Sequence, residues 1–92
     1  MNNFLEELGD RFQRLAAARG ATIDTPRLDS ALAQELLELA RVVAHSEERR
    51  FAPLASYLAG VAAERLYRSR SEISGQEVVA YVREVRASLE TA

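Results

Sequence analysis

The residues best suited to chemistry lie together between two apolar segments, in the stretch AHSEERRFAPL. His45 is the only histidine, and its ordinary pKa near neutrality would let it act as a general base. Arg49 and Arg50 could bind a phosphate or carboxylate through paired hydrogen bonds. One hypothesis for this corner is therefore a site for a small anionic ligand, such as a nucleotide or a pterin phosphate.

A structural interpretation of His45 competes with the catalytic one. Ser46 follows His45 directly, but nucleophilic catalysis needs the nucleophile within reach of the base and a third group that orients the base. A histidine in the last turn of a helix donates hydrogen bonds to free carbonyl groups, and the helix dipole favours its charged form there. We expect His45 to end one helix, Pro53 to begin the next, and the protein to be non-catalytic.

The amino-acid composition excludes several classes of cofactor site and metal site. The chain has 92 residues, no cysteine, and arginine at all twelve of its basic positions. There is thus no thiolate nucleophile, no cysteine zinc site, no lysine for pyridoxal phosphate and no P-loop. One histidine gives no pair to anchor zinc, and we interpret Glu35 and Glu38 as parts of a solvated helix face. We expect no metal and no cofactor.

A second group of arginines occurs in the stretch ERLYRSR. Arg65 and Arg68, with Tyr67 between them, could contact an anion, RNA or a protein partner. The net charge of −2 argues against broad affinity for nucleic acid. Arginines near the end of a helix are also favoured by the helix dipole, so solvation there is the alternative.

The first expected helix runs from an asparagine cap, at Asn2 or Asn3, to about Arg19. Gly20 suits the left-handed conformation that often ends a helix. Apolar residues recur at helical spacing and form one face, which consists of Phe4, Leu5, Leu8, Phe12 and Leu15.

The second expected helix follows a loop and has two alternative starts. One is a Thr25 cap with Pro26 at the first helical position, and the other is a later Asp29 cap. Its apolar stripe is broadened by Leu37 and Val42, so we expect this helix to be well buried.

The third expected helix begins near Ala52 or Pro53 and is apolar or small on nearly every side. A helix of that composition is usually central in its fold or covered by a second subunit. Gly60 in the middle of this helix costs about 1 kcal/mol relative to alanine. We therefore expect another backbone to approach Gly60 closely.

The fourth expected helix has the clearest start. Ser74 and Glu77 have the spacing of a capping box, and Ile73 and Val78 occupy the two positions of a hydrophobic staple. Its apolar residues then recur at steps of four and three, which is typical of a peripheral helix or of a seam between chains.

These elements predict one all-α domain over residues 1–92, a small antiparallel bundle of four helices with helix three central. Helix three and the seam of helix four offer more apolar surface than such a bundle needs. A homodimer or a larger protein partner would cover it, and a compact monomer would hide it. The candidate interface residues are Ser56, Gly60, Ala63, Tyr67, Val78, Val82, Val85 and Leu89.

The N-terminal stretch MNNFLEELGDRF carries acidic residues where a signal peptide would carry positive charge. No apolar run approaches the length of a transmembrane helix. We expect a cytoplasmic protein without a membrane partner.

The stretch LLELARVVAHSEERRFAPLASYLAGVAAER resembles a small actinobacterial-type helical domain of unknown function associated with molybdopterin-guanine dinucleotide biosynthesis. The similar positions are Leu39, Ala40, Arg41, Val43, Ala44 and His45, then Ala52, Pro53, Leu54, Leu58, Ala59, Gly60 and Ala62. This chain has HSEERRF where a shorter connection with glycine is common in that family. The resemblance implies a non-catalytic accessory or protein-interaction module linked to molybdenum-cofactor metabolism. The alternative is the anion-binding corner formed by His45, Arg49 and Arg50.

Overall fold

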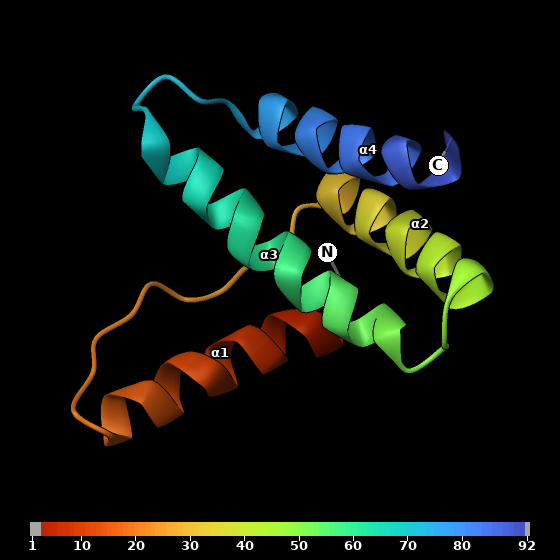
Figure 1. The fold of residues 1–92 in the computed structure, drawn as a ribbon. Coiled ribbons are helices and arrows are strands. Elements are labelled where there is room, and N and C mark those ends of the chain that lie inside the picture. Colours follow the sequence, from red (N-terminus) through yellow and green to blue (C-terminus); the bar gives the residue numbers. More distant parts are fainter. Residues whose placement is uncertain (1–2, 92) are drawn as a thin grey trace. The chain divides into compact units, whose positions relative to one another are not determined.

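The computed structural model describes residues 3–91, which form four α-helices and no strand (Figure 1). The helices are α1 (Asn3–Ala18), α2 (Ser30–Ser46), α3 (Phe51–Ser69) and α4 (Gly75–Thr91). This confirms the prediction of a small all-α bundle. The chain forms two compact units, of which the first ends at Ser30 and the second begins at Ala31.

In the first unit, the loop that follows α1 packs against one side of that helix. Arg27 donates from Nη2 to Asp10 Oδ1 at 2.7 Å and from Nη1 to the Glu6 carbonyl oxygen at 3.2 Å. A Cβ at Gly9 would overlap the Pro26 carbonyl oxygen, so the absence of a side chain there lets the loop approach. Gly9 is the buried residue of α1.

The end of α1 agrees with the sequence, but its apolar face is not buried. Gly20 has φ 81°, the left-handed conformation expected just after the helix. The expected cap at Asn2 lies outside the described residues, and Asn3 is already helical. Phe4, Phe12 and Leu15 are 58–70% exposed.

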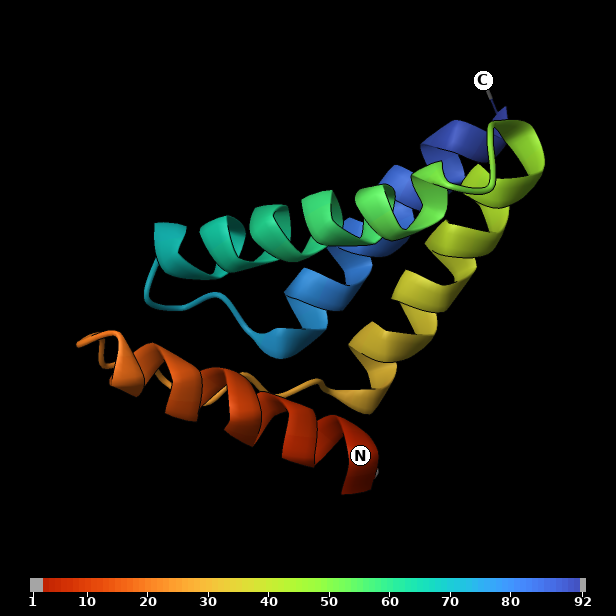
Figure 2. The same cartoon turned by 90° about the horizontal axis from the view of Figure 1, so that it is seen from below.

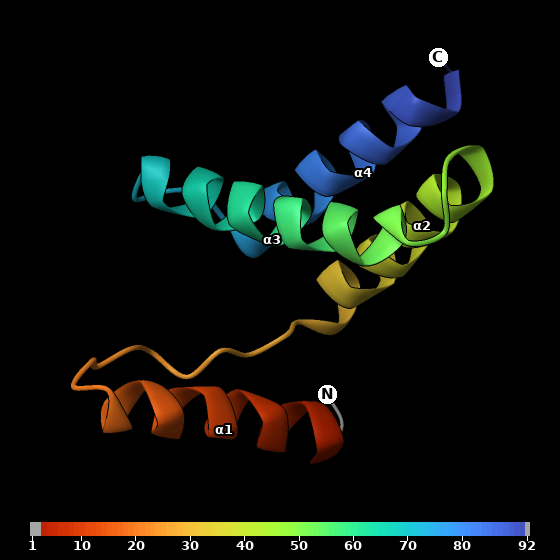
Figure 3. The ribbon, with the colours of Figure 1, turned by 60° about the horizontal axis from the view of Figure 1, so that its bottom comes forward.

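In the second unit, α2 and α4 run in the same general direction, and α3 runs in the opposite direction (Figures 1 and 2). A view from another side shows the same relation, with α3 crossing the other two helices rather than lying parallel to them (Figure 3). Within the second unit, the helices that approach each other most closely are α3 and α4. The predicted antiparallel arrangement of all four helices is not confirmed.

The core of the second unit is built mainly by α2 and α4. Its central cluster contains the buried residues Ala63, Ile73, Val78 and Val82, with Leu32, Leu36, Leu66 and Tyr81 packed against them. The buried residues of α2 are Ala33, Glu35, Leu39, Val42 and Val43. The helix expected to be peripheral or to form a seam between chains, α4, contributes Val78 and Val82 to this core.

The prediction that helix three is central is not confirmed. Ala63 is the one buried residue among those described in α3, whereas Leu54, Tyr57 and Leu58 are 60–71% exposed. Among the described residues, no atom outside the local backbone of α3 lies within 4 Å of the position that a Cβ at Gly60 would occupy. The expectation of a close backbone at Gly60 is therefore wrong within the second unit. The apolar pattern of α3 extends over several sides of the helix, and the second unit buries the side that carries Ala63.

The ends of the other helices follow local sequence signals. α2 begins at Ser30, directly after Asp29, which agrees with the later of its two predicted starts. At the start of α4 the backbone N–H of Glu77 donates to Ser74 Oγ at 3.2 Å, as the predicted cap requires. Both staple residues, Ile73 and Val78, are buried in the core cluster.

Candidate interaction surface

An apolar groove of about 240 Å³ lies on the second unit and is lined by all three of its helices. The lining residues are Leu39 and Val43 from α2, Ala55, Leu58, Ala59 and Ala62 from α3, and Tyr81, Val82, Val85 and Leu89 from α4. The Tyr81 hydroxyl is the single side-chain polar group in this lining.

A second hollow continues the groove along α3. It shares Leu58, Ala62 and Tyr81 with the first and adds Val61, Arg65 and Leu66. Arg65 is the one charged residue in the two linings. The combined surface, which we call the α3 groove, is thus apolar over most of its length and basic at the Leu66 end.

The sequence explains why the α3 groove is open. Alanine stands at positions 55, 59 and 62, where a larger side chain would fill the space between α3 and the other helices. Leu58 is 67% exposed beside them, and Val85 and Leu89 are 43% and 44% exposed. A continuous exposed apolar surface of this kind is typical of an interaction site.

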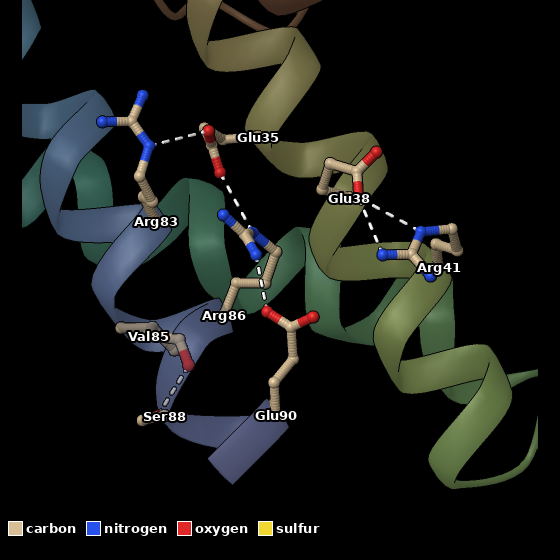
Figure 4. A network of polar contacts seen from close by, with 8 residues as sticks. All are labelled: Glu35, Glu38, Arg41, Arg83, Val85, Arg86, Ser88 and Glu90. Carbon is tan, nitrogen blue, oxygen red and sulfur yellow. Dashed lines mark hydrogen bonds and ion pairs between the residues drawn. The ribbon is translucent and has the colours of Figure 1, made fainter.

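A polar cluster ties α2 to α4 in the same unit (Figure 4). The buried Glu35 accepts hydrogen bonds from Arg83 Nε at 3.0 Å and from Arg86 Nε at 3.2 Å. Arg86 also donates from Nη1 to Glu90 Oε1 at 2.6 Å. The hydrogen bond from Arg83 lowers the pKa of Glu35 most, burial opposes it, and the hydrogen bond from Arg86 lowers the pKa further.

The expectation that Glu35 lies on a solvated face is therefore wrong. Glu35 follows Leu32 by three residues and precedes Leu39 by four, which places it on the apolar stripe of α2. The spacing of Glu35 from Leu32 and Leu39 is the sequence signal from which its burial could have been predicted. Guanidinium groups donate to both oxygens of the Glu35 carboxylate, so the cluster is a structural tie between α2 and α4.

The comparison with protein families assigns the chain. A family model described as a domain of unknown function, DUF6457, matches residues 1–92. The chain belongs to this family. Comparisons with curated proteins and with solved structures gave no match. The description of the DUF6457 family names no activity, cofactor or pathway, so the link to molybdopterin-guanine dinucleotide biosynthesis stays a prediction.

In this DUF6457 chain, the predicted corner between α2 and α3 is formed by residues 47–50. His45 is exposed in the last turn of α2, as expected of a residue that ends the helix. Arg50 Nε donates to Glu48 Oε2 at 2.8 Å, and its guanidinium lies 5.8 Å from the Phe51 ring centroid. Neither His45, Arg49 nor Arg50 lines either hollow.

The candidate interface residues of the DUF6457 domain fall into three groups. Ala63, Val78 and Val82 are buried in the core cluster, and Val82 also lines the groove. Val85 and Leu89 are exposed and line the groove. Ser56, Gly60 and Tyr67 line neither hollow.

Sequence reasoning missed Leu58 as a surface residue of this domain. Leu58 shares a helical face with Leu54, Val61, Ala62 and Leu66, and this spacing is the same for a core face and for an interface. Of the two later arginines, Arg65 lines the second hollow, whereas Arg68 is paired with Glu64 one turn earlier.

The described part of the domain holds no other candidate site of the kinds considered. No group of three or more His, Asp or Glu that could hold a metal ion occurs among residues 3–91. Within the same range, no helix combines the length and the apolar character needed to cross a membrane.

Proposed function

We propose that this DUF6457 domain is a non-catalytic protein-interaction module that self-associates through its α3 groove. The observation that supports this function is the exposure of Leu58, Val85 and Leu89 around one continuous hollow. Burying these side chains between two copies removes apolar surface from water, which is the main driving force of protein association.

The chemistry of the lining favours a protein partner over a small ligand. Sites for small molecules combine apolar walls with several placed polar groups that fix the ligand's orientation. Here the first hollow has the Tyr81 hydroxyl and the second adds Arg65. A helix that inserts its apolar face needs few polar groups, because the spacing of its side chains provides the specificity.

Sedimentation equilibrium tests the proposal. We expect the wild-type chain to form a dimer at micromolar concentration, and Leu58→Glu to weaken the dimer at least 100-fold because it places a charge in the apolar groove. The matched control is Leu37→Glu, since Leu37 is 65% exposed on α2 and lines neither hollow. A wild-type chain that stays monomeric at millimolar concentration, or equal effects of the two substitutions, would contradict the proposal.

The sequence makes two further predictions about function, and each has its own test. Anion binding at the corner predicts stabilisation by nucleotides or pterin phosphates in a thermal-shift assay, and loss of that effect when both Arg49 and Arg50 are replaced by alanine. A role in molybdenum-cofactor metabolism, which rests on the sequence resemblance, predicts lower molybdenum-enzyme activity in cells that lack this chain.

A further inference from the structure

We infer that the segment occupying the α3 groove is the apolar face of α1 from a second copy of this chain. This inference rests on the proposed function and names its partner segment. It follows from the exposed face of α1, from the length of that face and from the charges beside it.

Three of the five residues on the apolar face of α1 are exposed, and Leu5 and Leu8 are half-buried. Phe4, Phe12 and Leu15 lie within about 80° of one another around the helix axis, at 100° per residue. The loop that covers part of α1 packs at Gly9, about 60° around the axis from Phe12, and Arg27 holds it to Asp10 farther from the apolar face. Both aromatic rings and Leu15 are therefore available to a partner, at 58–70% exposure.

The length of this face matches the α3 groove. Phe4 and Leu15 are separated by about 16 Å along α1, at 1.5 Å per residue. The groove extends along α3 from Ala55 to Leu66, which is the same number of residues and the same rise. With α1 antiparallel to α3, Phe12 comes opposite Leu58 when Phe4 lies opposite Leu66.

The composition of the two surfaces is complementary. Alanines line the α3 side of the groove, and short side chains leave room for large rings from a facing helix. The α1 face provides two phenylalanines, and buried aromatic side chains are common anchors of protein interfaces. Phe12 is placed next to Ala55, Ala59 and Ala62 in this register.

Charged side chains favour one orientation of the second copy's α1 relative to α3. Arg65 lies at the Leu66 end of the groove, and Glu7 lies one turn from Phe4 on α1. The antiparallel orientation brings Glu7 toward Arg65. The parallel orientation brings Arg14 toward Arg65 instead, which opposes two like charges.

Cross-linking between two singly substituted chains tests the inference, because the chain has no cysteine of its own. We mix Phe12→Cys with Leu58→Cys, and Phe4→Cys with Leu66→Cys, and treat each mixture with a short bismaleimide. We expect at least a tenfold excess of the heterodimeric product over the control mixture of Ala17→Cys with Leu58→Cys. Ala17 is exposed on the side of α1 opposite the apolar face.

A second experiment exchanges the charges of Glu7 and Arg65 and measures the affinity of the dimer without a cross-linker. Glu7→Arg and Arg65→Glu should each weaken the dimer about tenfold in sedimentation equilibrium, and the doubly substituted chain should recover wild-type affinity. If the wild-type chain is a dimer, and Leu58→Cys chains cross-link to one another but not to Phe12→Cys chains, the inference is overturned and the proposed function stands. A monomeric wild-type chain would overturn both.

Discussion

At the scale of single residues, Glu35 is the buried charged group among the described residues of the second unit. Its carboxylate is buried and accepts hydrogen bonds from Arg83 and Arg86, so an amide at this position loses the shared negative charge and one of the two acceptor oxygens. We expect Glu35→Gln to lower the free energy of unfolding by about 1–2 kcal/mol at pH 7 in urea titrations. Glu38→Gln, which removes an exposed pair with Arg41, should change it by less than about 0.5 kcal/mol.

The effect of Glu35→Gln should depend on pH in a defined direction. The pKa of Glu35 is lowered by folding, so its contribution is fully present above the ordinary value of 4.5. The contribution is lost as the pH falls below that value and through the lower pKa of the folded state. The difference in free energy of unfolding between wild type and Glu35→Gln should therefore narrow as the pH is lowered through and below 4.5. A gap of constant size would show that the charge of Glu35 contributes nothing.

Gly60 is a residue whose replacement should stabilise the chain. It is exposed in the interior of α3, and a Cβ there meets no atom within 4 Å. Because glycine is a poor helix former, Gly60→Ala should raise the free energy of unfolding by about 0.5–1 kcal/mol. The self-association constant should stay unchanged, since Gly60 lines neither hollow. A weaker dimer would place the interface on the small-residue side of α3 instead.

At the scale of secondary-structure elements, the start of α4 rests on one side-chain hydrogen bond. Ser74 Oγ accepts the Glu77 backbone N–H, so Ser74→Ala leaves that donor at the helix end without its cap. We expect Ser74→Ala to lower the free energy of unfolding by about 1 kcal/mol, as measured by thermal or urea unfolding. Ser71→Ala is the control, because Ser71 lies in the preceding turn and bonds to Glu72. Equal losses would mean that the cap does not stabilise α4.

The packing of the loop on α1 depends on Gly9. A methyl group at this position would overlap the Pro26 carbonyl oxygen, so Gly9→Ala should release the loop although alanine favours the helix itself. Trypsin should then cleave after Arg27 several times faster than in the wild type, as read by mass spectrometry. Gly60→Ala serves as the control for the same chemical change. An unchanged rate at Arg27 would show that the loop does not need the missing side chain.

These elements show how far sequence alone reaches. The Ser74 cap involves residues three positions apart, so the pattern of a few residues was sufficient to predict it. Glu35 and Arg83 are 48 positions apart, and their pairing depends on how α2 and α4 pack. Leu54 and Leu58 lie four positions apart, which is the spacing of one helical face. It carried no information on whether this chain or another molecule covers that face.

At the scale of the whole molecule, both units expose apolar surface that their own folding leaves uncovered. In the first unit this surface is the face of α1, and in the second it is the α3 groove. A small domain buries a modest fraction of its surface, so covering a further face by association adds substantially to its stability. Self-association and folding should therefore be thermodynamically linked in this protein.

This linkage predicts that thermal stability rises with protein concentration. For a dimer that unfolds to monomers, each tenfold increase in concentration should raise the Tm of the wild type by roughly 3–6 °C. Leu58→Glu should have a Tm that is independent of concentration, whereas Leu37→Glu should keep the wild-type dependence because Leu37 lies outside the groove. Calorimetry at four protein concentrations that span a thousandfold range measures the Tm of the wild type and of both variants. If the Tm of all three chains is independent of protein concentration, the α3 groove does not drive association.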